Sequence, residues 1–321
     1  MLRIAVLGAG AHSTSSHGPA LAAAQQERPD EVQLAAVCDR DERKARRYAH
    51  KFGFARAYTD AAEMFGREVI DGLVAITPLE RTCELGCELL RMEVPLLLEK
   101  PPGRTVSEAR RLLSAAEQAG TPHMISFNRR FSPAVTRARQ WLAERDEERP
   151  PNLILARMLR HARTEQQFAM GTGVHPIDTV RYLRGDRQPE EIRARRVDAE
   201  RGTQIYDARM DFEGGGSAAL VIDPQCGTLE ETYEVLGPDY CVRINAHACS
   251  VQIFDRGETA LHWRAPGEWD SFQRGGTLAE THAFIDALLQ RRPFAPDLHA
   301  GLAVMRIAEI IENGQDTEIQ P

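Results

Sequence analysis

The first 127 residues alternate short apolar runs with stretches of helical periodicity, and this alternation constrains the fold more than any other feature. Near-continuous apolar runs indicate strands that are buried on both faces. Helices placed between such strands predict a parallel sheet that is covered on both sides. The expected strands are 3–8, 32–38, 72–77, 95–99 and 122–127, and the expected helices are 19–26, 41–52, 79–91 and 106–119.

The pattern changes after residue 131. A predicted helix over 132–147 is followed by strands over 152–159, 204–212, 217–222, 232–236, 241–245 and 251–254. Because no long helices separate most of these strands, they predict a largely antiparallel, open sheet. Helices are expected at 176–183, 278–290 and 301–313. We therefore expect an α/β chain with two domains: a Rossmann dinucleotide-binding domain over 1–127 and an α+β domain over 128–321, whose last helix is free to pack on either domain.

The composition excludes several classes of partner. Hydrophobic residues make up 42% and charged residues 27% of the chain, and the net charge is −7, so no basic surface for nucleic acid is expected. The arginine-rich run at 193–196 is interpreted as a solvated face. No apolar run approaches the ~18 residues that a membrane span needs. The six cysteines are scattered without zinc spacing, which predicts no metal site and reduced thiols in a cytoplasmic protein.

A glycine turn follows the first expected strand. Gly8, Gly10 and Ser13 form a G-x-G-x-x-S sequence that also includes Ala11. In dinucleotide-binding turns the first glycine permits the tight turn, the second lets the backbone approach a pyrophosphate, and the third position needs a small side chain. The pyrophosphate then lies on amide groups at the start of a helix. This context predicts a nicotinamide cofactor here.

The end of the second expected strand bears on the choice of cofactor. Asp39 is placed to accept hydrogen bonds from the adenosine ribose hydroxyls. Arg40 either meets a 2′-phosphate or faces water at the start of a helix. Since the carboxylate of Asp39 would repel a 2′-phosphate, we expect NAD, with NADP as the alternative.

The Glu99-Lys100-Pro101-Pro102 sequence follows a buried apolar run. Open α/β sheets bind ligands at the carboxyl ends of their strands, where Lys100 is placed. The prolines restrict the backbone around the lysine. A lysine beside a cationic nicotinamide suits proton transfer near neutral pH. The alternative is a surface lysine that follows a strand.

Polar side chains also follow the fifth expected strand and precede a later helix. Asn128, Arg129 and Arg130 are expected to bind substrate, with one arginine as a purely structural cation in the alternative. His175 precedes Pro176, a residue that favours the first helical position, so His175 either projects into a cleft or caps the helix. Asp178 is expected to orient a neighbour close to the substrate.

Three motifs, in this order, resemble those of the Gfo/Idh/MocA oxidoreductases over nearly the whole chain. They are the turn at Gly8, the Glu-Lys-Pro triplet at 99–101 and the Gly-x-His-x-x-Asp pattern at 173–178. The resemblance implies hydride transfer between a nicotinamide cofactor and a sugar or polyol, with Lys100 and His175 acting on the reacting oxygen. It implies cofactor contacts at Thr77, Pro78 and Glu99, and a homodimer or homotetramer formed through the open sheet.

The chain departs from the family pattern at three positions. Many members carry aspartate where this chain has Gly171, and asparagine and histidine where it has Leu79 and Thr82. Two alternatives to the dehydrogenase therefore stay open. One is a non-catalytic dinucleotide-binding regulator, and the other is a hydrolase that uses the nucleotide transiently.

Overall fold

The computed structural model describes residues 1–199, 202–315 and 317–318, and the chain divides into two compact units. The first unit comprises residues 1–128 and 271–302, and the second comprises 129–270 together with residues from 303 onward. The first change of unit lies one residue from the domain boundary expected at 127/128. Residues 271–302 differ from the expectation, because they belong to the first unit rather than the second.

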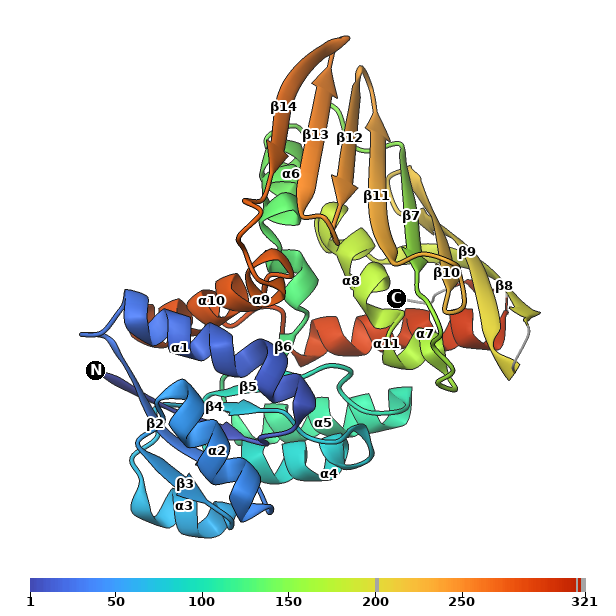
Figure 1. Ribbon diagram of the computed structural model, residues 1–321. Helices are drawn as coiled ribbons and strands as arrows, with labels where there is room; N and C mark the ends of the chain where they lie inside the picture. The colour runs from blue at the N-terminus through green and yellow to red at the C-terminus, as the bar shows by residue number, and fades with distance from the viewer. Residues whose placement is uncertain (200–201, 316, 319–321) are drawn as a thin grey trace. The chain divides into compact units, whose positions relative to one another are not determined.

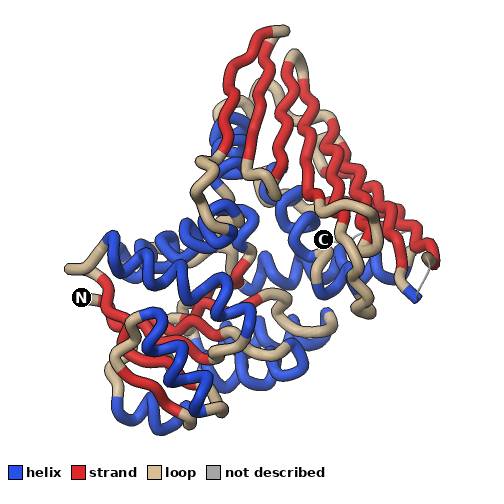
Figure 2. The backbone as a smooth tube through the Cα atoms, in the orientation of Figure 1, coloured by secondary structure: helices blue, strands red, loops and turns tan. Residues whose placement is uncertain are grey.

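The first unit contains a six-stranded parallel sheet with strand order β3-β2-β1-β4-β5-β6. This is the Rossmann order, and the direction of winding reverses between β1 and β4, where such sheets bind ligands. Figure 2 shows helices on both sides of the sheet. The strands are β1 (Leu2–Leu7), β2 (Val32–Cys38), β3 (Arg56–Tyr58), β4 (Gly72–Ala75), β5 (Leu96–Glu99) and β6 (His123–Ser126). The helices between them are α1 (Gly18–Glu27), α2 (Glu42–Phe52), α3 (Ala61–Arg67), α4 (Leu79–Leu90) and α5 (Val106–Ala119).

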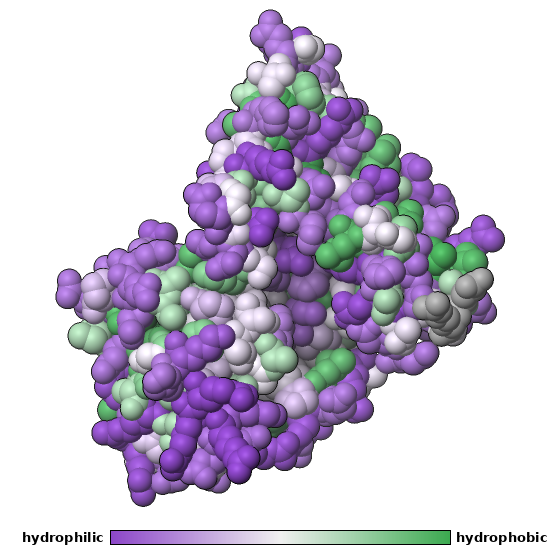
Figure 3. Space-filling model, in the orientation of Figure 1, coloured by the Kyte–Doolittle hydropathy of each residue, from purple (hydrophilic) through white to green (hydrophobic). Residues whose placement is uncertain are grey.

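Local sequence explains the ends of these elements. Every residue of β4 and β5 is buried, as expected for strands covered on both faces. The side chain of Asp41 accepts the amides of Arg43 and Lys44 at the start of α2, and Thr105 accepts the amide of Glu108 at the start of α5. The face of this unit seen in Figure 3 is mainly hydrophilic.

The returning segment contains α9 (Ser271–Arg274), α10 (Thr277–Gln290) and the beginning of α11 (Leu298–Asn313). Its place in the first unit has a packing cause. A Cβ atom at Gly72 would lie 2.8 Å from the side chain of Leu288 and 3.1 Å from that of Phe284, so the missing side chain lets α10 approach β4 closely. The Ser126 hydroxyl also donates to the carboxylate of Glu280 at 2.8 Å.

The second unit contains a nine-stranded sheet with strand order β14-β13-β12-β11-β7-β10-β9-β8-β15. β10 pairs with β7 in parallel, and the other described pairs are antiparallel. α6 and α8 pack on one face (Figure 1). The strands are β7 (Leu153–Leu159), β8 (Pro189–Asp198), β9 (Gln204–Phe212), β10 (Ser217–Asp223), β11 (Glu230–Gly237), β12 (Tyr240–Asn245), β13 (Ser250–Asp255), β14 (Glu258–Arg264) and β15 (Thr317–Glu318). The helices are α6 (Pro133–Ala143), α7 (Phe168–Gly171), α8 (Val174–Leu183) and the remainder of α11.

The expected fold class is confirmed, since a parallel Rossmann sheet is joined to a largely antiparallel sheet. The sequence pattern missed three strands of this sheet, β8, β14 and the two-residue β15, and the first two are mostly exposed. Among the described residues no helix is long and apolar enough to span a membrane.

Candidate active site

The turn after β1 forms one wall of a pocket of about 570 Å³ in the first unit. Gly8 has φ +105°, and a Cβ atom there would lie 2.1 Å from the carbonyl oxygen of Ile76 on the strand-end loop of β4. No larger residue fits this position. A Cβ at Gly10 would meet no described atom within 4 Å, so the backbone there is open to a ligand. These are the two features by which a glycine turn accommodates a pyrophosphate.

The helix after the turn begins at Ala11 and changes to a π-helical turn at Ser13–His17 before α1. The Ser13 side chain is buried and donates to the Tyr48 hydroxyl at 2.9 Å. A small residue at this third motif position therefore lets α2 pack beside the turn. Residues Gly10 to Ser13 at the start of this helix line the pocket, and a helix N-terminus favours an anion.

Asp39 joins the end of β2 to the glycine turn. One of its carboxylate oxygens accepts the amide of Ala9 at 2.8 Å, and the other accepts the amide of Asp41 at 2.9 Å. Asp39 and Arg40 both line the pocket. The structure brings eight of the expected cofactor residues together along this pocket, and they are Gly8, Gly10, Ala11, Ser13, Asp39, Arg40, Thr77 and Pro78.

Glu99 lies at the end of β5, one residue before Lys100, which is half-buried. Oε1 of Glu99 lies 2.9 Å from Nε2 of His12 and 2.8 Å from Nε2 of His17. Burial opposes ionisation of Glu99, but the hydrogen bonds and charges from His12 and His17 outweigh it and hold the pKa of this carboxyl well below its usual value. Because His12 also lines the pocket, the cluster connects Glu99 to the pocket wall. Sequence reasoning gave neither histidine this role.

The expected substrate residues Arg130 and Asp178 bind each other in the second unit. The Arg130 guanidinium donates to Asp178 through two hydrogen bonds of 2.7 and 2.6 Å, and it lies 2.7 Å from Asp186. Burial opposes the charge on Arg130, but these carboxylates outweigh it and raise the pKa of the guanidinium further. The geometry supports a structural role for this pair, the alternative that the sequence left open for one arginine.

The other expected substrate residues have partners as well. The side-chain amide of Asn128 donates to the carbonyl of Gly275 at 2.9 Å in the first unit. Arg129 lies 3.3 Å from the buried carboxylate of Glu231, which also accepts from Arg160 at 2.5 Å. Sequence reasoning missed Glu231 and Arg160, because neither belongs to a motif and only strand pairing brings them together.

His175 lies near the start of α8, where its side chain is mostly buried, and the hydroxyl of Thr179 donates to its backbone carbonyl at 2.9 Å. Lys100 belongs to the first unit and His175 to the second. Gly171, at the end of α7, has no positive φ, and a Cβ atom there would meet no described atom within 4 Å.

Comparisons with known proteins agree with this geometry. Residues 2–127 match the family described as "Oxidoreductase family, NAD-binding Rossmann fold". The first domain therefore matches the Gfo/Idh/MocA oxidoreductase family. The glycine turn, the open backbone at Gly10 and the carboxylate of Asp39 fit the NAD that this family binds.

Relatives extend the likeness beyond the first domain. A D-apiose dehydrogenase from Paraburkholderia graminis is 29% identical over 74% of this chain and 67% of its own length. An inositol 2-dehydrogenase from Rubrobacter xylanophilus is 24% identical over 87% of this chain and 82% of its own length. An oxidoreductase domain protein from Kribbella flavida shares the fold with a TM-score of 0.87 at 20% identity, covering 100% of this chain and 99% of its own. A levoglucosan dehydrogenase in complex with NADH and levoglucosan gives a TM-score of 0.84 at 17% identity, covering 100% of both chains.

Replacing Asp178 with asparagine should destabilise the second unit strongly. The change leaves the buried Arg130 guanidinium with one carboxylate partner in place of two, and breaking a buried pair in this way costs about 3–5 kcal/mol. Urea unfolding followed by tryptophan fluorescence measures this unit, because Trp141, Trp263 and Trp269 all lie in it.

The matched control is Asp211→Asn, which removes a partly exposed carboxylate that lies 3.5 Å from Arg209. This variant should change the free energy of unfolding by no more than about 1 kcal/mol. Equal effects of the two variants would show that the Arg130–Asp178 pair does not stabilise the fold.

Proposed function

We propose that this protein is a dehydrogenase that oxidises a hydroxyl-bearing carbon of a sugar or polyol with NAD. The proposal rests on the arrangement of residues in the first unit. His12 lines the pocket beside the glycine turn and hydrogen-bonds Glu99, and Lys100 follows Glu99 in the chain. A bound nicotinamide cofactor would supply the hydride acceptor. The protein must then hold the hydroxyl group and take its proton.

Lys100 and His175 are the proposed groups that act on the reacting oxygen. A half-buried lysine at the carboxyl end of β5 stands at the ligand-binding edge of the sheet. When its pKa is lowered by a neighbouring cation, a lysine transfers protons near neutral pH. His175, mostly buried at the start of α8, is the proposed second hydrogen-bonding partner of the substrate oxygen.

The relatives named above are dehydrogenases of apiose, inositol and levoglucosan, and they favour an enzyme over a regulator. A carbon carrying a secondary or hemiacetal hydroxyl is common to these substrates. The six cysteines are free thiols, which fits a cytoplasmic setting. The carboxylate of Asp39 favours NAD over NADP, since a 2′-phosphate would meet a negative charge.

The open face of the nine-stranded sheet is the proposed surface for self-association. Among the described helices, α6 and α8 pack on the other face. Leu155 is 38% exposed on β7, in a shallow depression shared with Val221 and Arg157. An exposed aliphatic side chain on a broad sheet is suited to pairing with a second copy of the chain.

A panel of sugars and polyols tests the proposed reaction. We expect the purified protein to reduce NAD⁺ with at least one member, and to bind NADH more tightly than NADPH. Absorbance of the reduced nicotinamide measures turnover, and fluorescence titration measures both affinities. Tight NADH binding without turnover would favour the regulator, and cleavage of a glycoside would favour the hydrolase.

Replacing Lys100 with methionine should lower kcat about 10²–10⁴-fold, the usual contribution of a proton-transfer group. The change roughly keeps the length of the side chain and removes its charge, so NADH affinity should change little. Lys51→Met is the matched control, because Lys51 is an exposed residue of α2 outside the pocket. Normal turnover of the Lys100 variant would return this lysine to an ordinary surface role.

Light scattering after size-exclusion chromatography should give a dimer or tetramer for the natural chain. The substitution Leu155→Arg should shift it toward the monomer, because it places a charge in the proposed contact. Ala219→Ser, a small change on the same depression, is the control. A monomeric natural chain at tens of micromolar would contradict the proposal.

A further inference from the structure

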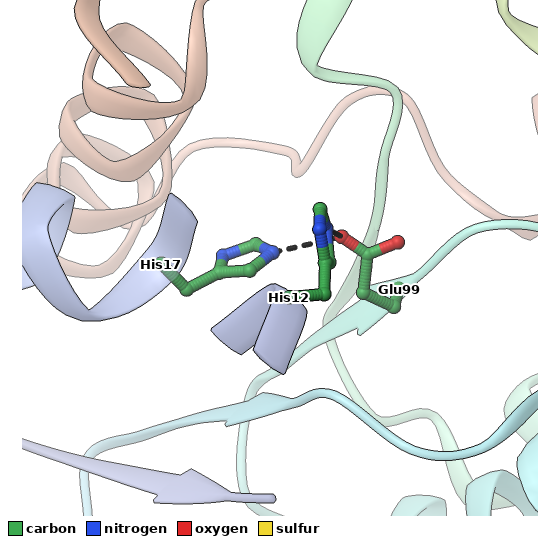
Figure 4. Close-up of side chains that lie close together, drawn as sticks. All are labelled: His12, His17 and Glu99. Atoms are coloured by element: carbon green, nitrogen blue, oxygen red, sulfur yellow. Dashed lines mark hydrogen bonds and ion pairs between the residues drawn. The ribbon is translucent and has the colours of Figure 1, made fainter. Parts of the chain in front are cut away.

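Two imidazoles meet one carboxylate at the edge of the cofactor pocket. His12 and His17 both reach Oε1 of Glu99, at 2.9 and 2.8 Å, and their rings lie edge to face with centroids 5.6 Å apart. Figure 4 shows the two rings directed at the same oxygen, while the other carboxylate oxygen points away from them. His12 occupies one of the unspecified positions of the glycine-turn motif, and His17 lies outside the motifs that suggested the enzyme.

The backbone places the two histidines together. They are five residues apart, a spacing that an α-helix does not align. The π-helical turn at Ser13–His17 has i→i+5 hydrogen bonding, which brings residues five apart to the same side. Such turns are frequent at functional sites. This local distortion of the helix therefore directs both imidazole rings toward Glu99.

The cluster has the donor set of a metal site, since its three ligand atoms lie within 4.8 Å of one another. The hydrogen bonding argues against a metal. A metal on Nε2 of His17 would leave its proton on Nδ1, and histidine ligands almost always donate that proton to an acceptor. Nδ1 of His17 is buried and has no hydrogen-bond partner within the described part of the chain. The favoured state is therefore the one in which Nε2–H of His17 donates to Glu99.

The two histidines differ in access to solvent. The side chain of His17 is 2% exposed, whereas that of His12 is 58% exposed and lines the pocket. His17 thus holds one side of the carboxylate in place. His12 presents an oriented ring to the pocket, with a carboxylate at its Nε2 that can stabilise the imidazolium. This is the pairing by which carboxylates support histidine bases.

We propose that His12 is a proton acceptor of the cofactor pocket, with Glu99 and His17 as the residues that position it. The proposal rests on the dehydrogenase function above. In alcohol oxidation the C–H bond breaks and its electron pair leaves as hydride to the nicotinamide, while the O–H bond breaks and C=O forms. Lys100, the group proposed above to act on the reacting oxygen, passes the released proton to the His12 imidazole, which faces Glu99 through Nε2, and the proton leaves from this exposed ring to solvent.

Other ionisable groups near the cluster bear on its titration. Lys100 follows Glu99 directly, and Asp39 and Arg40 share the pocket with His12. On the elements packed against the Ser13–His17 turn, most such groups bind elsewhere. Glu27 pairs with His282, Asp286 with Arg28, and Glu280 with Ser126, and α9 contributes the cation Arg274.

The first test needs no substrate. Histidine NMR signals of the cofactor-free protein are titrated, with the His12 signal assigned from its loss in His12→Gln. Glu99→Gln removes the charge and keeps an acceptor oxygen, so the pKa of His12 should fall by about one unit or more. The signal of His50, an exposed residue of α2, serves as the internal control and should not move. An unchanged pKa of His12 would overturn the proposal.

The second test uses the enzyme with NAD⁺ and the best substrate of the panel. His12→Gln should lower kcat about 10²-fold and remove the acidic limb of kcat/KM against pH, with NADH affinity within about threefold of the natural chain. His50→Gln should change neither. Full activity with an unchanged acidic limb in His12→Gln would overturn the role of His12, and in that case a loss of activity in Lys100→Met would leave the dehydrogenase function standing.

A third measurement separates the metal alternative. Co²⁺ is titrated into the natural chain and His17→Gln, with visible absorbance as the readout. Absence of stoichiometric binding is the expected result. Binding that disappears in His17→Gln would overturn the proposal, because a metal would then occupy the nitrogen that donates to Glu99.

Discussion

The missing side chain at Gly8 is the constraint on which the cofactor pocket depends. The Gly8 amide donates to the carbonyl of Cys38 at 2.8 Å on one side, and its α-carbon faces the carbonyl of Ile76 on the other. β1 is therefore held between β2 and β4 up to its last residue, at the point where the winding of the sheet reverses. The turn cannot move away from either neighbour, so Asp39, Thr77 and the helix start are all fixed around the same space.

Buried carboxylates hold the rest of each site in place, and each is stabilised by more than one donor. Glu99 is bound by two histidines, Asp178 by both arms of Arg130, and Glu231 by Arg160 and the hydroxyl of Tyr233. Burying a lone carboxylate is costly, and paired hydrogen bonds are what make it tolerable. Arg130 is thereby removed from the groups available to a substrate, whereas Arg129 at the edge of the Glu231 pair keeps partial exposure.

Hydrophobic periodicity predicted the helices and strands that are buried on one face or on both faces. The sequence pattern predicted the five longer strands of the first sheet and the helices α1, α2, α4 and α5, whereas the seven-residue α3 was missed. β3 was missed because three residues are too short to show a period, and β14 because most of its residues are exposed. The placement of α10 in the first unit depends on Gly72, which faces Phe284 and Leu288 from far away in the sequence, and no local pattern encodes this contact.

The cofactor residues were predictable because the glycine motif falls at the ligand-binding edge of the sheet. The ion pairs of the second unit were not, since Arg160 meets Glu231 through strand pairing and Arg130 meets Asp178 through tertiary packing. The departures from the family pattern follow the same division. Thr82 stands where many members have histidine. Its hydroxyl hydrogen-bonds the hydroxyl of Thr77 at 3.1 Å and the carbonyl of Pro78 at 3.2 Å, so it stabilises the turn that follows β4. Gly171 leaves open space where many members place a carboxylate near His175. A carboxylate–imidazole pair lies instead in the first unit, where His12 follows the glycine turn and Glu99 ends β5. Because that pair and Lys100 lie at one edge of the sheet, the groups proposed to handle protons in the first unit are positioned by the Rossmann fold alone.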